Sequence, residues 1–257
     1  DALVTPDGPN PYAYVAFTPR RNVDPDGLIL VAFDGTDNSD DPTWLRQKGS
    51  TVSNVVLFRR AYDDGPASYV TGVGTDHARR DTYGDILSRT YDAGWIPDRG
   101  GNYSGPDRVR RMLLYFNDQA DGFDDDNVMD IDIIGFSRGA AQARHFANRL
   151  VSATRDGWYR YFKHDRDGSL LMTDSGPIAA CQRVNFRFMG LFDTVLSTNR
   201  SELAYDLSIP AAFPYVAQAV ALNEYRSAPA GLDAFFTAPV NFLLWEDTRI
   251  NLANDDH

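Results

Sequence analysis

Blocks of hydrophobic and polar positions follow one another along this chain in a pattern that predicts strands alternating with helices. The segment Leu28 to Phe33 is almost continuously apolar and ends in Asp34-Gly35-Thr36, which is typical of a buried parallel strand entering a turn. The other blocks predict strands over Ala67 to Val73, Val128 to Ile134 and Val184 to Phe192, and helices over Ser53 to Tyr62 and Arg108 to Gln119. This alternation predicts an α/β fold with a mostly parallel central sheet flanked by helices.

The segment Gly135-Phe136-Ser137-Arg138-Gly139 lies between one predicted strand and an alanine-rich stretch with helical spacing. A serine hydroxyl is a poor nucleophile, so it must project from a sharp turn where a base and backbone amides can reach it. The two glycines suit such a turn because strand and helix then approach too closely for a Cβ atom. The segment therefore predicts the nucleophile elbow of an α/β-hydrolase-like fold. The alternative is an ordinary glycine-bounded loop.

The 257 residues fit one such domain. Residues 1 to 27 are rich in Pro, Asp and Gly and predict an irregular lead-in, and residues 28 to 257 predict a single catalytic domain. Two polar stretches, about 76–106 and 152–182, read as irregular insertions.

Asp193 follows the predicted strand Val184 to Phe192 and is expected at the same sheet edge as the elbow. We interpret Asp193 as the acid of a Ser-Asp-His triad, although it could instead cap the next helix. The oxyanion hole is expected to take the backbone N–H of Arg138 and one from Gly35 or Thr36. Asp34 is expected to hold the turn by accepting amide hydrogen bonds, the alternative being a pair with Arg138.

Four histidines could supply the base, namely His77, His145, His164 and His257. His145 comes eight residues after Ser137, about 12 Å along a helix that rises 1.5 Å per residue, which is too far from the hydroxyl. His77 and His164 precede Asp193, whereas α/β-hydrolases present serine, acid and histidine in that order. His257 is therefore the predicted base.

Composition narrows the classes of partner. The formal net charge of -11 disfavours nucleic acid and electrostatic capture by an anionic membrane. No apolar run approaches the roughly eighteen residues of a membrane span, and no signal peptide is expected. No cofactor is expected: Asp165, Asp167 and Asp174 could form a calcium loop, but their spacing favours a solvated insertion over an EF-hand. The single cysteine, Cys181, is expected to be buried.

Several ordered motifs, spanning residues 28 to 226, resemble those of one family. They are Phe33-Asp34-Gly35-Thr36 with Asn38, Asn54-Val55, Gly72-Val73-Gly74-Thr75, the elbow extended to Ala141, Gly190-Leu191-Phe192-Asp193-Thr194-Val195, and Ala221-Leu222-Asn223-Glu224-Tyr225-Arg226. The family comprises the α/β-hydrolase-like type VI secretion lipase effectors, the Tle phospholipases.

The resemblance implies that Ser137 attacks a phospholipid ester, with Asp193 orienting the histidine. It also implies antibacterial activity at the periplasm or membrane of a target cell, contact-dependent delivery with secretion-tip proteins, and a cognate immunity protein. A lipase should add an apolar lid or groove, for which Ala211 to Val220 is a candidate, although such a stripe is more often core. A soluble esterase of non-lipid substrates and a catalytically inert binding or delivery module are the alternatives.

Overall fold

The structure is a computed structural model that describes residues 27–75, 104–123, 127–165, 167–195 and 205–220. Several expectations lie outside these residues: the lead-in, most of the first insertion, the motif from Ala221 to Arg226, and the histidines His77 and His257.

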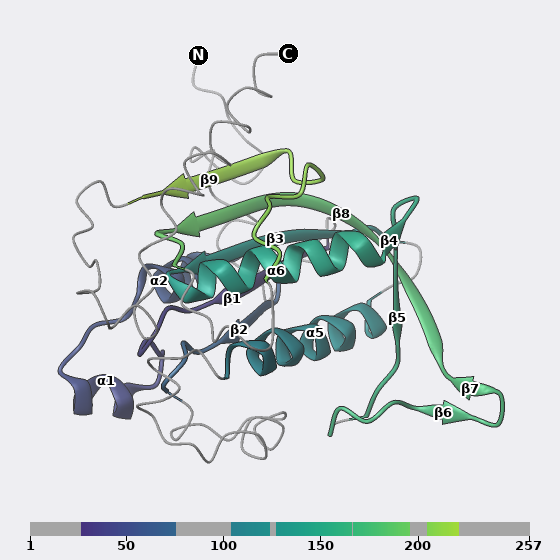
Figure 1. The fold of residues 1–257 in the computed structure, drawn as a ribbon, viewed down its shortest axis with the longest axis horizontal. Helices are drawn as coiled ribbons and strands as arrows, with labels where there is room; N and C mark the ends of the chain where they lie inside the picture. Colours follow the sequence, from purple (N-terminus) through teal and green to yellow (C-terminus); the bar gives the residue numbers. More distant parts are fainter. Residues whose placement is uncertain (1–26, 76–103, 124–126, 166, 196–204, 221–257) are drawn as a thin grey trace, which may run out of the picture.

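A parallel sheet forms the centre of the described fold (Figure 1). Its strands run in the order β2 (Ala67–Val70), β1 (Leu28–Phe33), β3 (Met129–Phe136) and β8 (Ala179–Phe192), and β9 (Tyr215–Ala219) pairs with the second half of β8. All four of these pairings are parallel. The expected α/β fold with a mostly parallel sheet flanked by helices is therefore confirmed.

Helices cover both faces of the sheet because side chains alternate along its buried strands. From β1, Ile29, Val31 and Phe33 contribute to the larger core cluster, together with residues of α5 (Gly105–Asp121) and α6 (Arg138–Ala153). Leu30 and Ala32 point to the other face and pack with Val55 of α2 (Asn54–Ala61). The short helix α1 (Pro42–Lys48) follows β1, and Asp41 caps it by accepting from the Thr43 amide. No described helix is long and apolar enough to cross a bilayer.

The stretch 152–182 is not irregular, contrary to the expectation from its polar composition. It forms the antiparallel strands β4 (Thr154–Arg155), β5 (Trp158–Phe162), β6 (Met172–Thr173) and β7 (Gly176–Pro177), and β5 pairs with the first half of β8. Along β5 exposed and buried residues alternate, with Tyr159 packed edge-on against Phe116 of α5. The outer face of β5 also carries the aromatic residues Trp158 and Phe162, so the sequence shows no alternation of apolar and polar residues there.

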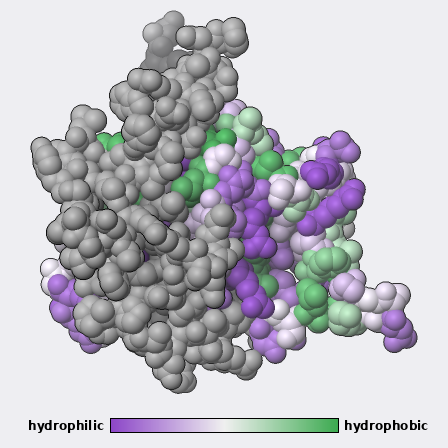
Figure 2. All heavy atoms as spheres, viewed as in Figure 1, coloured by the Kyte–Doolittle hydropathy of each residue, from purple (hydrophilic) through white to green (hydrophobic). Residues whose placement is uncertain are grey.

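These strands form an arm that extends from the end of the sheet opposite the elbow (Figure 1). Figure 2 shows hydrophobic surface along it, and Phe162, Leu170 and Met172 are each at least half exposed. Cys181 is exposed, contrary to expectation, because it faces outward from β8 opposite Arg160. It therefore occupies a solvent-facing position of a half-buried strand.

The stretch Ala211 to Val220 contributes a strand rather than a separate lid. Phe213 is buried in the larger core cluster, where its ring lies 5.1 Å from that of Phe186. Tyr215 of β9 is 68% exposed. The segment therefore contributes Phe213 to the core and, two residues later, exposes Tyr215 at the surface.

The first turn of α6 lies directly against the end of β1. A Cβ atom added to Gly139 would lie 2.4 Å from the carbonyl oxygen of Asp34 and 2.6 Å from that of Phe33. A Cβ on Gly135 would lie 2.7 Å from the Cα of Ala140. Because these neighbours are backbone atoms, no side-chain rotation can relieve the overlap.

We expect Gly139→Ala to lower the free energy of unfolding by roughly 1–3 kcal/mol, as overpacking of a close contact does. Urea denaturation monitored by circular dichroism would measure it. Gly122→Ala is the matched control, because a Cβ there lies 3.6 Å from its nearest neighbour, an ordinary contact. Equal losses in the two variants would contradict this account of the elbow.

Candidate active site

Ser137 lies at the junction of β3 and α6 in the strained conformation expected of a nucleophile elbow. Its φ and ψ are 54° and -125°, a region that residues with a Cβ rarely occupy. Its amide donates to the carbonyl of Phe192 at 2.8 Å, and its own carbonyl accepts from the Val195 amide at 3.1 Å. The elbow is therefore fixed to the chain on both sides of Asp193.

Backbone strain gathers at this edge of the sheet. Among the described residues, four non-glycine residues have positive φ: Asp37, Ser137, Asp156 and Asp193. Three of them follow β1, β3 and β8 at the carboxyl ends of these strands, and the fourth lies in the turn between β4 and β5. Such strain persists only where the surroundings hold it in place, and it is concentrated at functional sites.

Parallel pairing brings Asp193 beside the elbow. Phe136 of β3 is the register partner of Phe192 of β8, so Ser137 and Asp193 are the next residues on neighbouring strands. Adjacent strands lie about 4.8 Å apart. The Asp193 amide donates to the Ala219 carbonyl at 2.7 Å, which fixes its backbone against β9.

Asp34 holds the turn after β1, as one of its two expected roles requires. Its carboxylate is only 1% exposed and accepts from the Gly35 amide at 2.8 Å and from the Tyr69 hydroxyl at 2.7 Å. Burial raises the pKa of Asp34 above its usual value of 3.8, and the hydrogen bonds from Tyr69, Ser53 and Gly35 partly offset this. Arg138 donates instead to Thr36, from Nε to Oγ1 at 2.6 Å.

The two alternatives for the second oxyanion donor differ in their hydrogen bonds. The Gly35 amide is engaged by Asp34, whereas the amide of Thr36 donates to no acceptor within the described part of the chain. Thr36 follows Gly35 at the corner of a turn closed by the Asn38 amide on the Gly35 carbonyl at 3.0 Å. The geometry favours Thr36.

Neither described histidine is placed to act on Ser137. His145 stacks on Tyr205 with ring centroids 5.0 Å apart, and its Nδ1 accepts from the Asp206 amide at 3.2 Å. Burial lowers the pKa of His145, and the nearby positive charge of Arg149 lowers it further. These contacts give His145 a structural role in securing residues 205–208 to α6.

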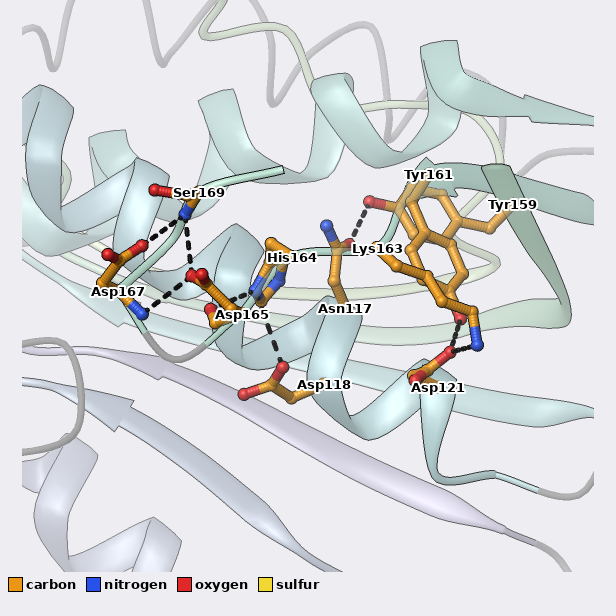
Figure 3. A network of polar contacts seen from close by, with 10 residues as sticks. All are labelled: Asn117, Asp118, Asp121, Tyr159, Tyr161, Lys163, His164, Asp165, Asp167 and Ser169. Carbon is orange, nitrogen blue, oxygen red and sulfur yellow. Dashed lines mark hydrogen bonds and ion pairs between the residues drawn. The ribbon is translucent and has the colours of Figure 1, made fainter. Parts of the chain in front are cut away.

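His164 belongs to the arm, as Figure 3 shows. Its Nδ1 lies 3.8 Å from a carboxylate oxygen of Asp118, near the carboxyl end of α5. Asp165 accepts backbone amides of Asp167 and Ser169, each at 3.1 Å, and so closes the turn between β5 and β6. In the described part of the chain, no group of three or more His, Cys, Asp or Glu residues is arranged to hold a metal ion.

No protein-family model matches the sequence, and no curated protein matches it significantly. Among the solved structures that align with it are the following two. An uncharacterized protein from Pseudomonas aeruginosa is 18% identical, with 74% of this chain and 34% of that chain covered and a TM-score of 0.39. The Tle1 effector bound to the VgrG spike from the Type 6 secretion system is 20% identical, with 77% and 45% covered and a TM-score of 0.37. The chain thus spans less than half the length of either protein.

Sequence reasoning missed the contribution of Tyr69. A tyrosine in an apolar strand carries no signal of a polar role, but Tyr69 pairs in register with Ala32, two residues before Asp34. Burial raises the pKa of Tyr69, so its hydroxyl stays protonated and donates to Asp34. Only the pairing of β1 with β2 could have indicated this contact.

We expect Tyr69→Phe to destabilise the fold by about 1.5–3 kcal/mol at pH 8, because the buried Asp34 carboxyl group loses a hydroxyl donor. The bond favours the charged carboxylate, so its loss raises the folded-state pKa of Asp34 further above 3.8. In the wild type and in Tyr69→Phe, ionisation of Asp34 in the folded state lowers the free energy of unfolding as pH rises through its raised pKa. This loss is larger in the variant. The difference between them should therefore shrink as pH is lowered toward 4.

Urea titrations of both proteins from pH 8 to pH 4 would measure this. Tyr159→Phe is the matched control, because the Tyr159 hydroxyl donates to the neutral amide oxygen of Asn117 at 2.8 Å. Its cost should not vary with pH. A pH-independent cost for Tyr69→Phe as well would show that Asp34 is not the acceptor that matters.

Proposed function

We propose that this chain is a serine carboxylester hydrolase of the phospholipase A type, with Ser137 as the nucleophile. The observation that carries the proposal is the strained, positive-φ backbone of Ser137 at a strand-to-helix junction, fixed by hydrogen bonds to both sides of Asp193. Ser137 is only half-buried, so a substrate can approach it. The turn at Thr36 lies at the same sheet edge, and its amide donates to no acceptor among the described residues.

In the proposed reaction the Ser137 oxygen attacks the ester carbonyl carbon while a general base removes the hydroxyl proton. The carbonyl oxygen becomes an oxyanion, stabilised by the amides of Arg138 and Thr36. The intermediate collapses, the ester C–O bond breaks, and the base returns the proton to the leaving alcohol. Water then attacks the acyl-serine with help from the same base, which releases the fatty acid and restores the Ser137 hydroxyl.

We assign the base to His257 and its orientation to Asp193, following the order of serine, acid and histidine. The phospholipid substrate and the role of an antibacterial type VI effector are supported by the ordered motifs that resemble the Tle phospholipases. On the same support, the chain would be delivered into a target cell with secretion-tip proteins, and the producing cell would hold an immunity protein.

One observation favours a second candidate, a catalytically inert binding or delivery module. The histidines in the described part of the chain are His145 and His164, and both are engaged away from the elbow. If His257 does not reach Ser137, the elbow lacks its base. A soluble esterase would use the same residues and would differ only in its substrate.

We expect the chain to release fatty acid from vesicles of mixed phosphatidylethanolamine and phosphatidylglycerol. Ser137→Ala and His257→Ala should each lower the rate of release at least 1,000-fold, because triad members act as a unit. The measurement is the amount of free fatty acid released over time. Ser152→Ala, which removes an exposed serine hydroxyl from the same helix, should retain full activity.

The pattern of losses separates the candidates. Loss with Ser137→Ala but not with His257→Ala would move the base to another residue while leaving the esterase proposal intact. Hydrolysis of small soluble esters without release from vesicles would favour the soluble esterase. Activity in no assay would favour the inert module.

A further inference from the structure

The two proposed oxyanion donors belong to elements that are far apart in the sequence. Arg138 opens α6 and Thr36 lies in the turn after β1, 102 residues earlier. Donors accelerate acyl transfer only if they are already aimed at the position where negative charge develops. Something must therefore fix the Thr36 amide relative to the elbow.

We propose that the Arg138 side chain is a positioning residue that fixes the Thr36 amide relative to the elbow. Its Nε donates to Thr36 Oγ1 at 2.6 Å, a charge-assisted bond within the hydrogen-bonding range. Arg138 is only 7% exposed. The inference rests on the proposed function, and it gives the side chain after the nucleophile a role beyond that of its backbone amide.

The carbonyl and hydroxyl groups of Thr36 are both engaged by neighbouring side chains, so its amide is the group that could donate to a substrate. The Asn38 side chain donates to the Thr36 carbonyl at 2.9 Å, while Arg138 holds the Thr36 hydroxyl. Within the described residues the Thr36 amide donates to no protein acceptor. Two of the three polar groups of Thr36 are thus fixed, and the third is a donor.

Backbone contacts hold the same turn from its other side. The Asp37 amide donates to the Val73 carbonyl at 2.9 Å, and the Gly72 amide donates to the Asn38 carbonyl at 2.9 Å. A Cβ on Gly72 would lie 1.5 Å from the carbonyl oxygen of Gly35, so the two chains touch. The turn is anchored on the β2 side by backbone and on the elbow side by Arg138. Removing the Arg138 contact should shift the turn without unfolding it.

An arginine suits this role better than a lysine. Its guanidinium is planar and always charged, and it presents its donors in fixed directions, whereas a lysine ammonium is a flexible point charge. Because the acceptor is the neutral hydroxyl of Thr36, the turn carries no negative charge at this residue. By contrast, a carboxylate at position 36 would place negative charge where the oxyanion is to form.

The test compares Thr36→Val, Thr36→Ser, Arg138→Gln and the double variant Thr36→Val/Arg138→Gln with the wild-type chain. We expect Thr36→Val and Arg138→Gln each to lower kcat for a p-nitrophenyl ester about 10- to 100-fold with KM within twofold. Loss of a whole donor costs on the order of 100- to 1,000-fold, and here the donor is displaced rather than removed. Thr36→Ser should restore most of kcat.

A double-mutant cycle makes the readout specific to the contact. If the bond acts as proposed, the double variant should be no slower than Arg138→Gln alone, because both changes remove the same interaction. A trifluoromethyl ketone, which forms a tetrahedral oxyanion adduct with an active-site serine, should bind each variant more weakly in proportion to its loss in kcat/KM.

Thr43→Val is the matched control, because it removes a hydroxyl that accepts from Arg46 on the exposed surface of α1. Its kcat should equal that of the wild type. Wild-type kcat in Thr36→Val and Arg138→Gln, or fully additive losses in the double variant, would overturn the positioning role and leave the proposed esterase standing. A wild-type chain that hydrolyses no ester would overturn both.

Discussion

The contact between the first turn of α6 and the end of β1 is the constraint on which this sheet edge depends. Gly139 touches the backbone carbonyls of Phe33 and Asp34 with no space for a side chain. This contact places the elbow directly beside the turn that follows β1. In the proposed oxyanion hole, an elbow even one side chain further away could not act together with the Thr36 amide, because hydrogen-bond donors act only within about 3 Å.

The pairing register of the strands then brings Asp193 to the same edge as the elbow and the turn after β1. Strand β3 pairs in parallel with β1 on one side and with β8 on the other. Asp34, Ser137 and Asp193 follow the carboxyl ends of these strands and therefore lie at one edge of the sheet. The cost of this arrangement is local: a buried carboxylate with a raised pKa and strained backbone at Asp37, Ser137 and Asp193. Tyr69 and the Gly35 amide offset part of that cost at Asp34. The larger apolar core on the α5 and α6 side stabilises the scaffold that holds the strain in place.

Sequence pattern predicted the central elements well because buried parallel strands are continuous apolar runs. Leu28–Phe33 has the predicted bounds, and the elbow motif fixed the junction of β3 with α6. The arm was missed because aromatic residues occupy both faces of β5, which hides its alternation, and because polar outward residues such as Arg183 interrupt the first half of β8. Side-chain partnerships between elements, including Arg138 with Thr36, depend on tertiary distances that no local pattern encodes.

Strand β8 runs from the arm to Asp193, and polar contacts stabilise it where its pairing with β5 gives way to its regular pairing with β3 and β9. Its first half pairs antiparallel with β5 and its second half pairs parallel with β3, with a register shift between Ile131 and Asp132. Asp132 is only 2% exposed there, and a buried carboxylate must be hydrogen-bonded to be tolerated. Arg187 and the Tyr62 hydroxyl both donate to it. The polar cluster thus holds the irregularity in place, so that the five residues from Phe188 to Phe192 reach Asp193 in register with both β3 and β9.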